Sequence, residues 1–167
     1  MKAREEEFLM LVEKHKRIIY KVSKMYMSHA EDQEDLFQEI MLQLWKSYGQ
    51  FRGESQFSTW MYRVAVNTAL VTFKKDRKKI DHPVLDEKMD LADEHDSENK
   101  EEKLEFFYKA VHELNAVEKA LIFLFLEGQS HRQIAENLGI TEVNARVKLN
   151  RTKEKLQLII KQKGYEF

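Results

Sequence analysis

Apolar residues recur every three or four positions through the first half of the chain, the spacing of helices that bury one face. This spacing predicts a long helix over residues 4–27 and a second helix that stops near Gly49. Ser28 and Glu31 have the spacing of a capping box, in which each side chain satisfies a backbone N–H at the start of a helix. We therefore expect Ser28 to open the second helix.

A third helix is expected after the loop around Gly53, with Ser58 or Thr59 as its cap and its end near Lys78. Residues 81–102 then show no sustained period and are strongly acidic. A segment of this composition cannot bury enough apolar surface to fold by itself. The pattern predicts a flexible acidic linker.

The helical period returns at Glu102 and ends at Gly128, where a glycine is suited to the left-handed turn that closes many helices. Ser130 and Gln133 have the spacing of another capping box and predict a short helix. A tight turn at Gly139 follows, and then a longer helix that Thr141 caps and that runs to about Gln162. This order is typical of a helix-turn-helix.

The last helix carries the side chains that proteins use to read a DNA groove. Arginine can bridge the two acceptors of a guanine, and asparagine can pair with adenine. The candidate positions are Thr141, Asn144, Arg146, Val147, Asn150 and Arg151. The plain alternative is a solvated helical hairpin with no ligand.

Composition supports an all-α fold, because the 167 residues include one proline and five glycines. The expected architecture is two small helical domains, residues 1–80 and 103–167, joined by the linker at 81–102. Cysteine is absent, which excludes disulfides and thiolate metal sites. The sequence shows no signal peptide and no long apolar run, so a cytoplasmic protein without direct membrane insertion is expected.

The net charge of -1 conceals a strong segregation of charge. Residues 74–79, KKDRKK, and residues 141–163 are basic, whereas residues 81–105 between them are acidic. Clustered positive charge of this kind indicates a polyanionic partner.

Aromatic residues precede the first basic run. Trp60 and Tyr62 lie close to the amide of Asn67 and upstream of KKDRKK. Aromatic faces stack on unpaired bases, an amide reads a base edge and basic residues hold the backbone, so this segment is equipped for single-stranded nucleic acid. The alternative is that the aromatic side chains are core residues.

Two segments resemble one known family. DLFQEIMLQLWKSYGQFRGESQFSTWMYRVAVNTAL, residues 35–70, is similar to the core-binding and promoter-melting region of bacterial sigma-70 factors. GQSHRQIAENLGITEVNARVKLNRTKEKL, residues 128–156, resembles the promoter-reading region of the same family. With two domains and a short linker, the chain is most similar to the extracytoplasmic-function group. The string FRGxSxFxTWxYRxAxNTA is highly specific to that family.

The resemblance implies three sets of site residues. The set that docks on the β′ clamp of RNA polymerase is Asp35, Gln38, Glu39, Leu42 and Trp45. The set that contacts the minus-10 element is Phe51, Trp60, Arg63, Asn67, Lys74 and Lys75, with Asn67 near the pocket for a flipped base. The residues that face the minus-35 element by this resemblance are Arg146, Val147, Asn150 and Arg151, and the groove-reading candidates Thr141 and Asn144 complete the predicted set.

The resemblance also implies partners and a function. The expected partners are core RNA polymerase, through its β′ clamp and β flap, promoter DNA and an anti-sigma factor. The acidic linker is expected to thread the polymerase channel. The chain departs from the family pattern at two places. Residues 131–133, His-Arg-Gln, stand where the family often has an aromatic residue and two acids, so a partner contact made there is not expected to carry over. Ala145 stands where valine is common, so looser packing is expected under the last helix.

Other classes of function fit less well. The six histidines are scattered, and no glycine-rich phosphate loop or nucleophile motif is present. No catalytic residue, metal or cofactor is therefore expected, and a metal-dependent hydrolase is remote. The remaining alternative is a stand-alone helix-turn-helix regulator that binds duplex DNA as a dimer. Such a regulator has no need of the block at 35–67.

Overall fold

The structure is a computed structural model that describes residues 2–79 and 98–164, with the side chains of 75–79 and 98–99 outside the described part. The described residues form α-helices and one 3₁₀ turn, and none of them forms a strand. The all-α prediction is confirmed within this part of the chain. The elements are α1 (Lys2–Tyr26), α2 (Ala30–Ser47), η1 (Tyr48–Gln50), α3 (Phe57–Lys79), α4 (Glu98–Val111), α5 (Ala116–Leu126), α6 (His131–Leu138) and α7 (Glu142–Gln162).

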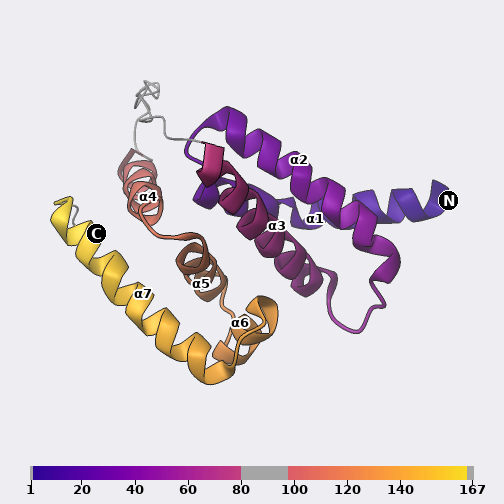
Figure 1. The fold of residues 1–167 in the computed structure, drawn as a ribbon. Helices are drawn as coiled ribbons and strands as arrows, with labels where there is room; N and C mark the ends of the chain where they lie inside the picture. Colours follow the sequence, from indigo (N-terminus) through magenta and orange to yellow (C-terminus); the bar gives the residue numbers. More distant parts are fainter. Residues whose placement is uncertain (1, 80–97, 165–167) are drawn as a thin grey trace.

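The first three helices pack together, with α3 in contact with both α1 and α2 (Figure 1). Their shared core is aliphatic, and Ile19, Ile40 and Met61 are fully buried in it. Ile19 and Ile40 belong to the inward stripes that the helical period predicted for the first two helices. The same packing leaves the opposite face of α2 exposed, whereas α3 also contacts α5 and α6.

In the second half, α5 packs against α7, and α6 joins them through the glycine turn (Figure 1). Leu124, Ile134 and Leu149 are fully buried there, one from each of the three helices. Gly139 adopts φ 68°, a left-handed conformation in which a side chain is strained. The helix-turn-helix prediction is confirmed in its elements and in its turn.

Helix starts are where the sequence interpretation was partly wrong. The N-cap of α2 is His29, without a side-chain cap, and not Ser28. The Gln33 side chain instead reaches back from the first turn and donates to the Met27 carbonyl at 2.8 Å. α3 begins at Phe57, so Ser58 and Thr59 lie inside its first turn and cap nothing.

The two later cap predictions are confirmed. Ser130 and Gln133 form a reciprocal capping box at α6, and the Thr141 hydroxyl accepts from the Asn144 N–H at 3.1 Å. A further capping box, Asn115 with Glu118, was missed. It splits the helical pattern that begins near Glu102 into α4 and α5.

α4 starts at Glu98, inside the segment predicted as linker. Residues 81–97 of that segment lie outside the described residues.

Candidate functional site

The exposed face of α2 carries the predicted polymerase-docking set. Asp35, Gln38, Leu42 and Trp45 follow one another at intervals of three and four, so they form one stripe. Leu36, Ile40 and Leu44 are buried on the opposite side, which fixes the orientation of the helix. Glu39 lies beside the stripe and accepts a hydrogen bond from Gln43 Nε2 at 3.0 Å.

Two large apolar side chains on this stripe remain open to solvent. Leu42 is 44% exposed and Trp45 is 43% exposed. Exposed apolar residues framed by carboxylate and amide groups are typical of a protein docking surface. The arrangement on α2 can therefore bind a partner through both apolar contact and charge.

An aromatic cluster fills the end of the first half where α2, η1 and α3 meet. The Trp60 ring lies 5.2 Å from Phe51 and 5.3 Å from Phe57, and Tyr48 is 6.2 Å away. Phe57 is buried, whereas Phe51 and Trp60 are half-buried. The core interpretation therefore holds for Phe57. Phe51 and Trp60 keep a surface that can meet a base.

Tyr62 does not belong to this cluster. Its ring packs 5.9 Å from Phe123 of α5, and its hydroxyl donates to Glu127 Oε1 at 3.1 Å. Burial, with a smaller contribution from the Glu127 carboxylate, raises the pKa of Tyr62, so the hydroxyl stays protonated and remains a donor. Trp60 and Tyr62 are neighbours in sequence but face different parts of the molecule.

Four of the six predicted minus-10 residues lie along one stripe of α3. Trp60, Arg63, Asn67 and Lys74 are three, four and seven residues apart, which places them on one helix face. Arg63, Asn67 and Lys74 are exposed. Phe51 joins the stripe through its contact with Trp60, and the side chain of Lys75 lies outside the described residues. Aromatic rings, cations and an amide along one face of a helix can hold unpaired DNA.

The predicted minus-35 residues are exposed at the start of α7, where Thr141 is the N-cap and the others lie in the first half of the helix: Asn144, Arg146, Val147, Asn150 and Arg151. Ala145, Leu149 and Thr152 are buried on the opposite side of the helix. The small Ala145 is completely enclosed, so the departure from the family pattern leaves it fully packed. The outer face of α7 is free to enter a groove.

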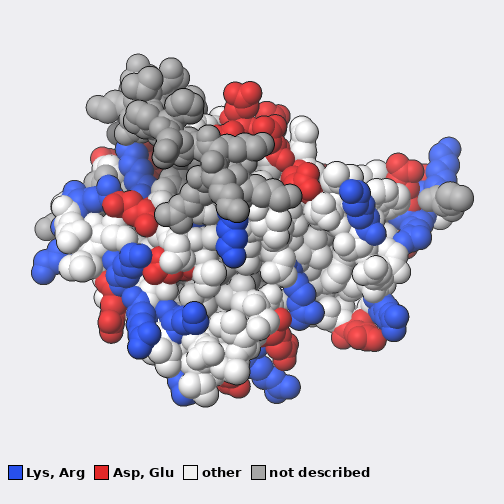
Figure 2. Space-filling view, viewed as in Figure 1, with Lys and Arg blue, Asp and Glu red and all other residues white. Residues whose placement is uncertain are grey.

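Positive charge follows the same helix. α7 contains more Lys and Arg than acidic residues. Figure 2 shows Lys and Arg side chains repeatedly along the left and lower edge, which α7 forms in Figure 1. Such a basic edge neutralises phosphates and holds DNA without reading its sequence.

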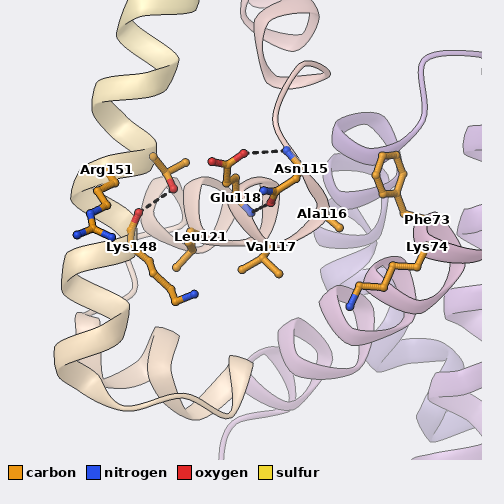
Figure 3. A pocket seen from close by; sticks show the side chains of 10 residues that line it. Phe73, Lys74, Asn115, Ala116, Val117, Glu118, Leu121, Lys148 and Arg151 are labelled. Carbon is orange, nitrogen blue, oxygen red and sulfur yellow. Dashed lines mark hydrogen bonds between the residues drawn. The ribbon is translucent and has the colours of Figure 1, made fainter. Parts of the chain in front are cut away.

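A pocket of about 380 Å³ lies between α3, the start of α5 and α7. Lys74 enters it from α3, and Lys148 and Arg151 border it from α7 (Figure 3). Val117 and Leu121 line its floor. The pocket therefore brings a predicted minus-10 residue and a predicted minus-35 residue to one place.

Contacts between the two halves are a feature that sequence reasoning missed. Tyr26 donates its hydroxyl to the Ala116 carbonyl at 2.6 Å, and His112 Nε2 lies 2.9 Å from the Lys24 carbonyl. Burial lowers the pKa of His112, partly offset by that carbonyl, so the neutral ring donates to it. No local motif signals such pairs, because the residues are far apart in sequence.

Two other features were sought in the part of the chain that the structure describes, a metal site and a membrane span. Among the described residues, no group of three or more His, Asp or Glu side chains is placed to hold a metal ion. No helix in the described ranges is long and apolar enough to cross a membrane.

Comparison with known families agrees with this arrangement. The family model for sigma-70 region 2 matches residues 11–79, and the model for sigma-70 region 4 matches residues 107–156. The first match contains the α2 and α3 stripes. The second contains the helix-turn-helix and the predicted minus-35 residues.

Individual proteins show the same likeness. The RNA polymerase sigma-H factor of Pseudomonas aeruginosa is 37% identical over 62 residues, which span 37% of this chain and 32% of that protein. The ECF RNA polymerase sigma-E factor of Haemophilus influenzae is 28% identical over 162 residues, with 90% of this chain and 85% of that protein covered. The match thus spans only a third of the sigma-H factor but most of the sigma-E factor.

A solved structure is similar in fold. It is the sigma factor RpoE from Bartonella quintana in complex with the anti-sigma factor NepR, with a TM-score of 0.64 and 20% identity. The similarity covers 96% of this chain and 98% of that chain. From the two family models and these relatives, we conclude that the chain belongs to the sigma-70 family, in its extracytoplasmic-function group.

Proposed function

We propose that this chain is a sigma factor that binds core RNA polymerase and directs it to promoters. It recognises a minus-10 and a minus-35 element and helps to open the DNA. The observation that carries the proposal is the presence, on one chain matched by both sigma-70 region models, of three separate exposed faces on α2, α3 and α7.

Each face has a separate task in this proposal. Residues 1–80 act as region 2: the α2 stripe docks on the β′ clamp, and the α3 stripe holds unpaired minus-10 DNA. Residues 103–167 act as region 4, in which α7 reads the minus-35 element and the domain contacts the β flap. The acidic segment at 81–102 connects them and threads the polymerase channel.

The mechanism requires no covalent chemistry by this chain. Stacking on Trp60 and hydrogen bonding to Asn67 are available only to an unpaired base, so these residues stabilise melted DNA over duplex. Contacts of α7 in the major groove fix the register of the polymerase. Promoter opening is then driven by differential binding, and the chain is not an enzyme.

An anti-sigma factor is proposed as a further partner. The similar RpoE structure contains the anti-sigma factor NepR, and it aligns over nearly the whole of this chain. The proposed function also places the protein in the cytoplasm, where polymerase and chromosome are found.

Docking through α2 is tested by reversing charge on its stripe. Asp35→Lys combined with Glu39→Lys places two cations where the proposal needs anions, and like-charge contacts at an interface cost several kcal/mol. We expect the affinity for core RNA polymerase to fall by about 100-fold or more. The measurement is a titration of labelled protein with core enzyme.

The matched control is Glu101→Lys with Glu105→Lys, which makes the same charge change on the exposed side of α4. It is expected to bind core polymerase as the wild type does. Equal affinity of the α2 variant and the wild type would show that α2 is not the docking face. If the wild-type protein does not bind core polymerase but does bind palindromic duplex DNA, the stand-alone regulator would be the better account.

A further inference from the structure

Two valines lie at the centre of the outer face of α7, in its first two turns. Val143 is 58% exposed and Val147 is 38% exposed. With 3.6 residues per turn, both side chains leave the helix within about 30° of the direction opposite its buried residues. Because they are one turn apart on the same face, they form a short apolar surface, which we call the valine ridge.

Polar side chains flank the valine ridge on both sides. Asn144 and Arg151 lie on one side, and Arg146 and Asn150 lie on the other. All four are exposed. The flanks can form hydrogen bonds with base edges and phosphates, whereas the ridge between them can make apolar contacts only. The start of α7 therefore combines two kinds of chemistry on one face.

The fold itself does not depend on the valine ridge. Within the described residues, neither valine belongs to the hydrophobic core or to the partly buried side chains packed against it. The α7 residues that line the pocket of Figure 3 are Lys148, Arg151 and Thr152 instead. Valine also favours a helix less than alanine does, because its branched side chain loses rotamer freedom there. The exposed pair is therefore better explained by a ligand than by stability.

DNA offers one apolar group in its major groove. This group is the C5-methyl of thymine, which proteins recognise by apolar contact. In a helix-turn-helix, the N-terminal residues of the second helix meet the base edges, and the valine ridge occupies that part of α7. Single exposed apolar side chains are common on protein surfaces. Two that adjoin at the centre of a DNA-reading face have a specific partner available.

We propose that Val143 and Val147 recognise thymine C5-methyl groups in the minus-35 element. The inference deepens the proposed function and rests on it, because it requires that α7 reads duplex DNA. It adds Val143 to the residues that read the element, and it gives Val147 a chemical partner. The arginines and asparagines on the flanks read hydrogen-bonding groups, and the valine ridge reads methyl groups.

The spacing of the valines limits where the thymines lie. Cβ atoms one helical turn apart are about 5–6 Å from each other, and bases along a strand are about 3.4 Å apart. The two thymines should therefore lie within two positions of one another. Glu154 is exposed on the same line, two turns after Val147. Phosphates repel its negative charge, so the apolar contact is confined to the first two turns of α7.

Deoxyuridine tests the contact at the level of one methyl group, because it pairs as thymine does but lacks the C5-methyl. The complex of the whole protein with core RNA polymerase first selects its minus-35 sequence from a randomised promoter library, and the protein alone is selected in parallel. Each thymine is then replaced singly by deoxyuridine, and affinity is measured by competition. We expect about a fourfold loss at each of two positions, the equivalent of one buried methyl group.

Two variants assign these positions to side chains. Val143→Ala should remove the preference for thymine over deoxyuridine at one position, and Val147→Ala should remove it at the other. Each variant loses exposed methyl groups and gains helix propensity, so the fold is expected to be retained. The readout is the thymine-to-deoxyuridine affinity ratio within one protein. A general loss of affinity cannot imitate a change in that ratio.

Leu158→Ala is the matched control. Leu158 is 56% exposed and lies on the same face of α7, three turns beyond Val147. Truncating this side chain removes apolar surface from the helix without touching the valine ridge. Both affinity ratios should therefore keep their wild-type values.

The outcomes separate this inference from the proposed function. Equal affinity for thymine and deoxyuridine at every position, a selected sequence without thymine on either strand, or ratios unchanged in both valine variants would overturn the valine contact. Each of these results leaves the sigma function intact if the complex still initiates at fixed positions. Methyl-dependent binding by the protein alone, without initiation by core polymerase, would support the valine contact and overturn the proposed function. Failure to select any sequence, with or without polymerase, would overturn both.

Discussion

Asn67 is the residue whose proposed role depends most on a single side chain. It is exposed on α3, two helical turns from Trp60 and one turn from Arg63. An amide can donate and accept at once, so it can match the edge of one unpaired base. A duplex hides that edge, so in the proposed function this side chain distinguishes open from closed DNA.

Replacing Asn67 with alanine should weaken promoter opening by about 1–3 kcal/mol, the usual value of a good amide-to-base contact. The measurement is the fluorescence of 2-aminopurine in the minus-10 element, with binding to a minus-35 duplex measured in parallel. Opening should fall and duplex binding should stay the same. Gln157→Ala, an exposed amide on α7, is the control, and equal opening by Asn67→Ala and this control would refute the assignment.

His112 makes stability depend on pH. Burial lowers its pKa below the usual value of about 6.5, so the unfolded chain takes up a proton more readily than the folded chain. The contribution of the neutral His112 to the free energy of unfolding should therefore be complete above about pH 6.5. It should decrease as the pH falls below that value. His15, whose pKa is lowered by burial and by Lys14, acts in the same direction.

Urea unfolding at pH 7.5 and pH 5.5 measures this effect. His112→Gln keeps a donor for the Lys24 carbonyl but cannot take up a proton. Its loss of stability between the two pH values should be smaller than that of the wild type. The same loss in both proteins would mean that His112 does not titrate as its surroundings require.

At the scale of elements, α7 divides its two faces between packing and recognition. Leu149 and Leu156 are buried, whereas Arg146 and Arg151 on the opposite side are exposed. Because the inner face is fixed by the core, the proposed function has the outer side chains enter a groove in a defined register.

Arg146→Ala or Arg151→Ala should cost about 1–3 kcal/mol and relax the preference at one minus-35 position. Binding to a library of minus-35 sequences measures both quantities. Lys161→Ala, near the end of the same helix, should change affinity only slightly and leave base preference intact. Unchanged base preference in both arginine variants would count against recognition by this face.

The elements also show what a sequence pattern can and cannot predict. The inward stripes of α1 and α2, the Ser130 and Thr141 caps and the Gly139 turn follow from residue spacing, because each depends on neighbours within one or two turns. Helix starts were predicted less well. At α3 the need to bury Phe57 moved the start ahead of Ser58, since tertiary packing overrides a weak capping preference.

At the scale of the whole molecule, the arrangement of the two halves was not predictable from the sequence. Lys21 donates to Glu127 from 106 residues away in the sequence, and nothing near either residue indicates the other. Tyr62 illustrates the consequence. Its neighbourhood suggested stacking on nucleic acid, yet its ring packs on Phe123. The three candidate faces could be predicted from the sequence as separate sets of residues. The contacts that bring the α3 and α7 sets to one pocket could not.

The central claim is that this chain directs core RNA polymerase to promoters. The most direct measurement mixes purified protein with bacterial core RNA polymerase and a random promoter library, and then sequences the transcripts. The account predicts initiation at fixed positions downstream of a shared two-part motif, and loss of that initiation with Asp35→Lys and Glu39→Lys combined. Transcripts with no shared motif, or the same transcripts from core polymerase alone, would contradict it.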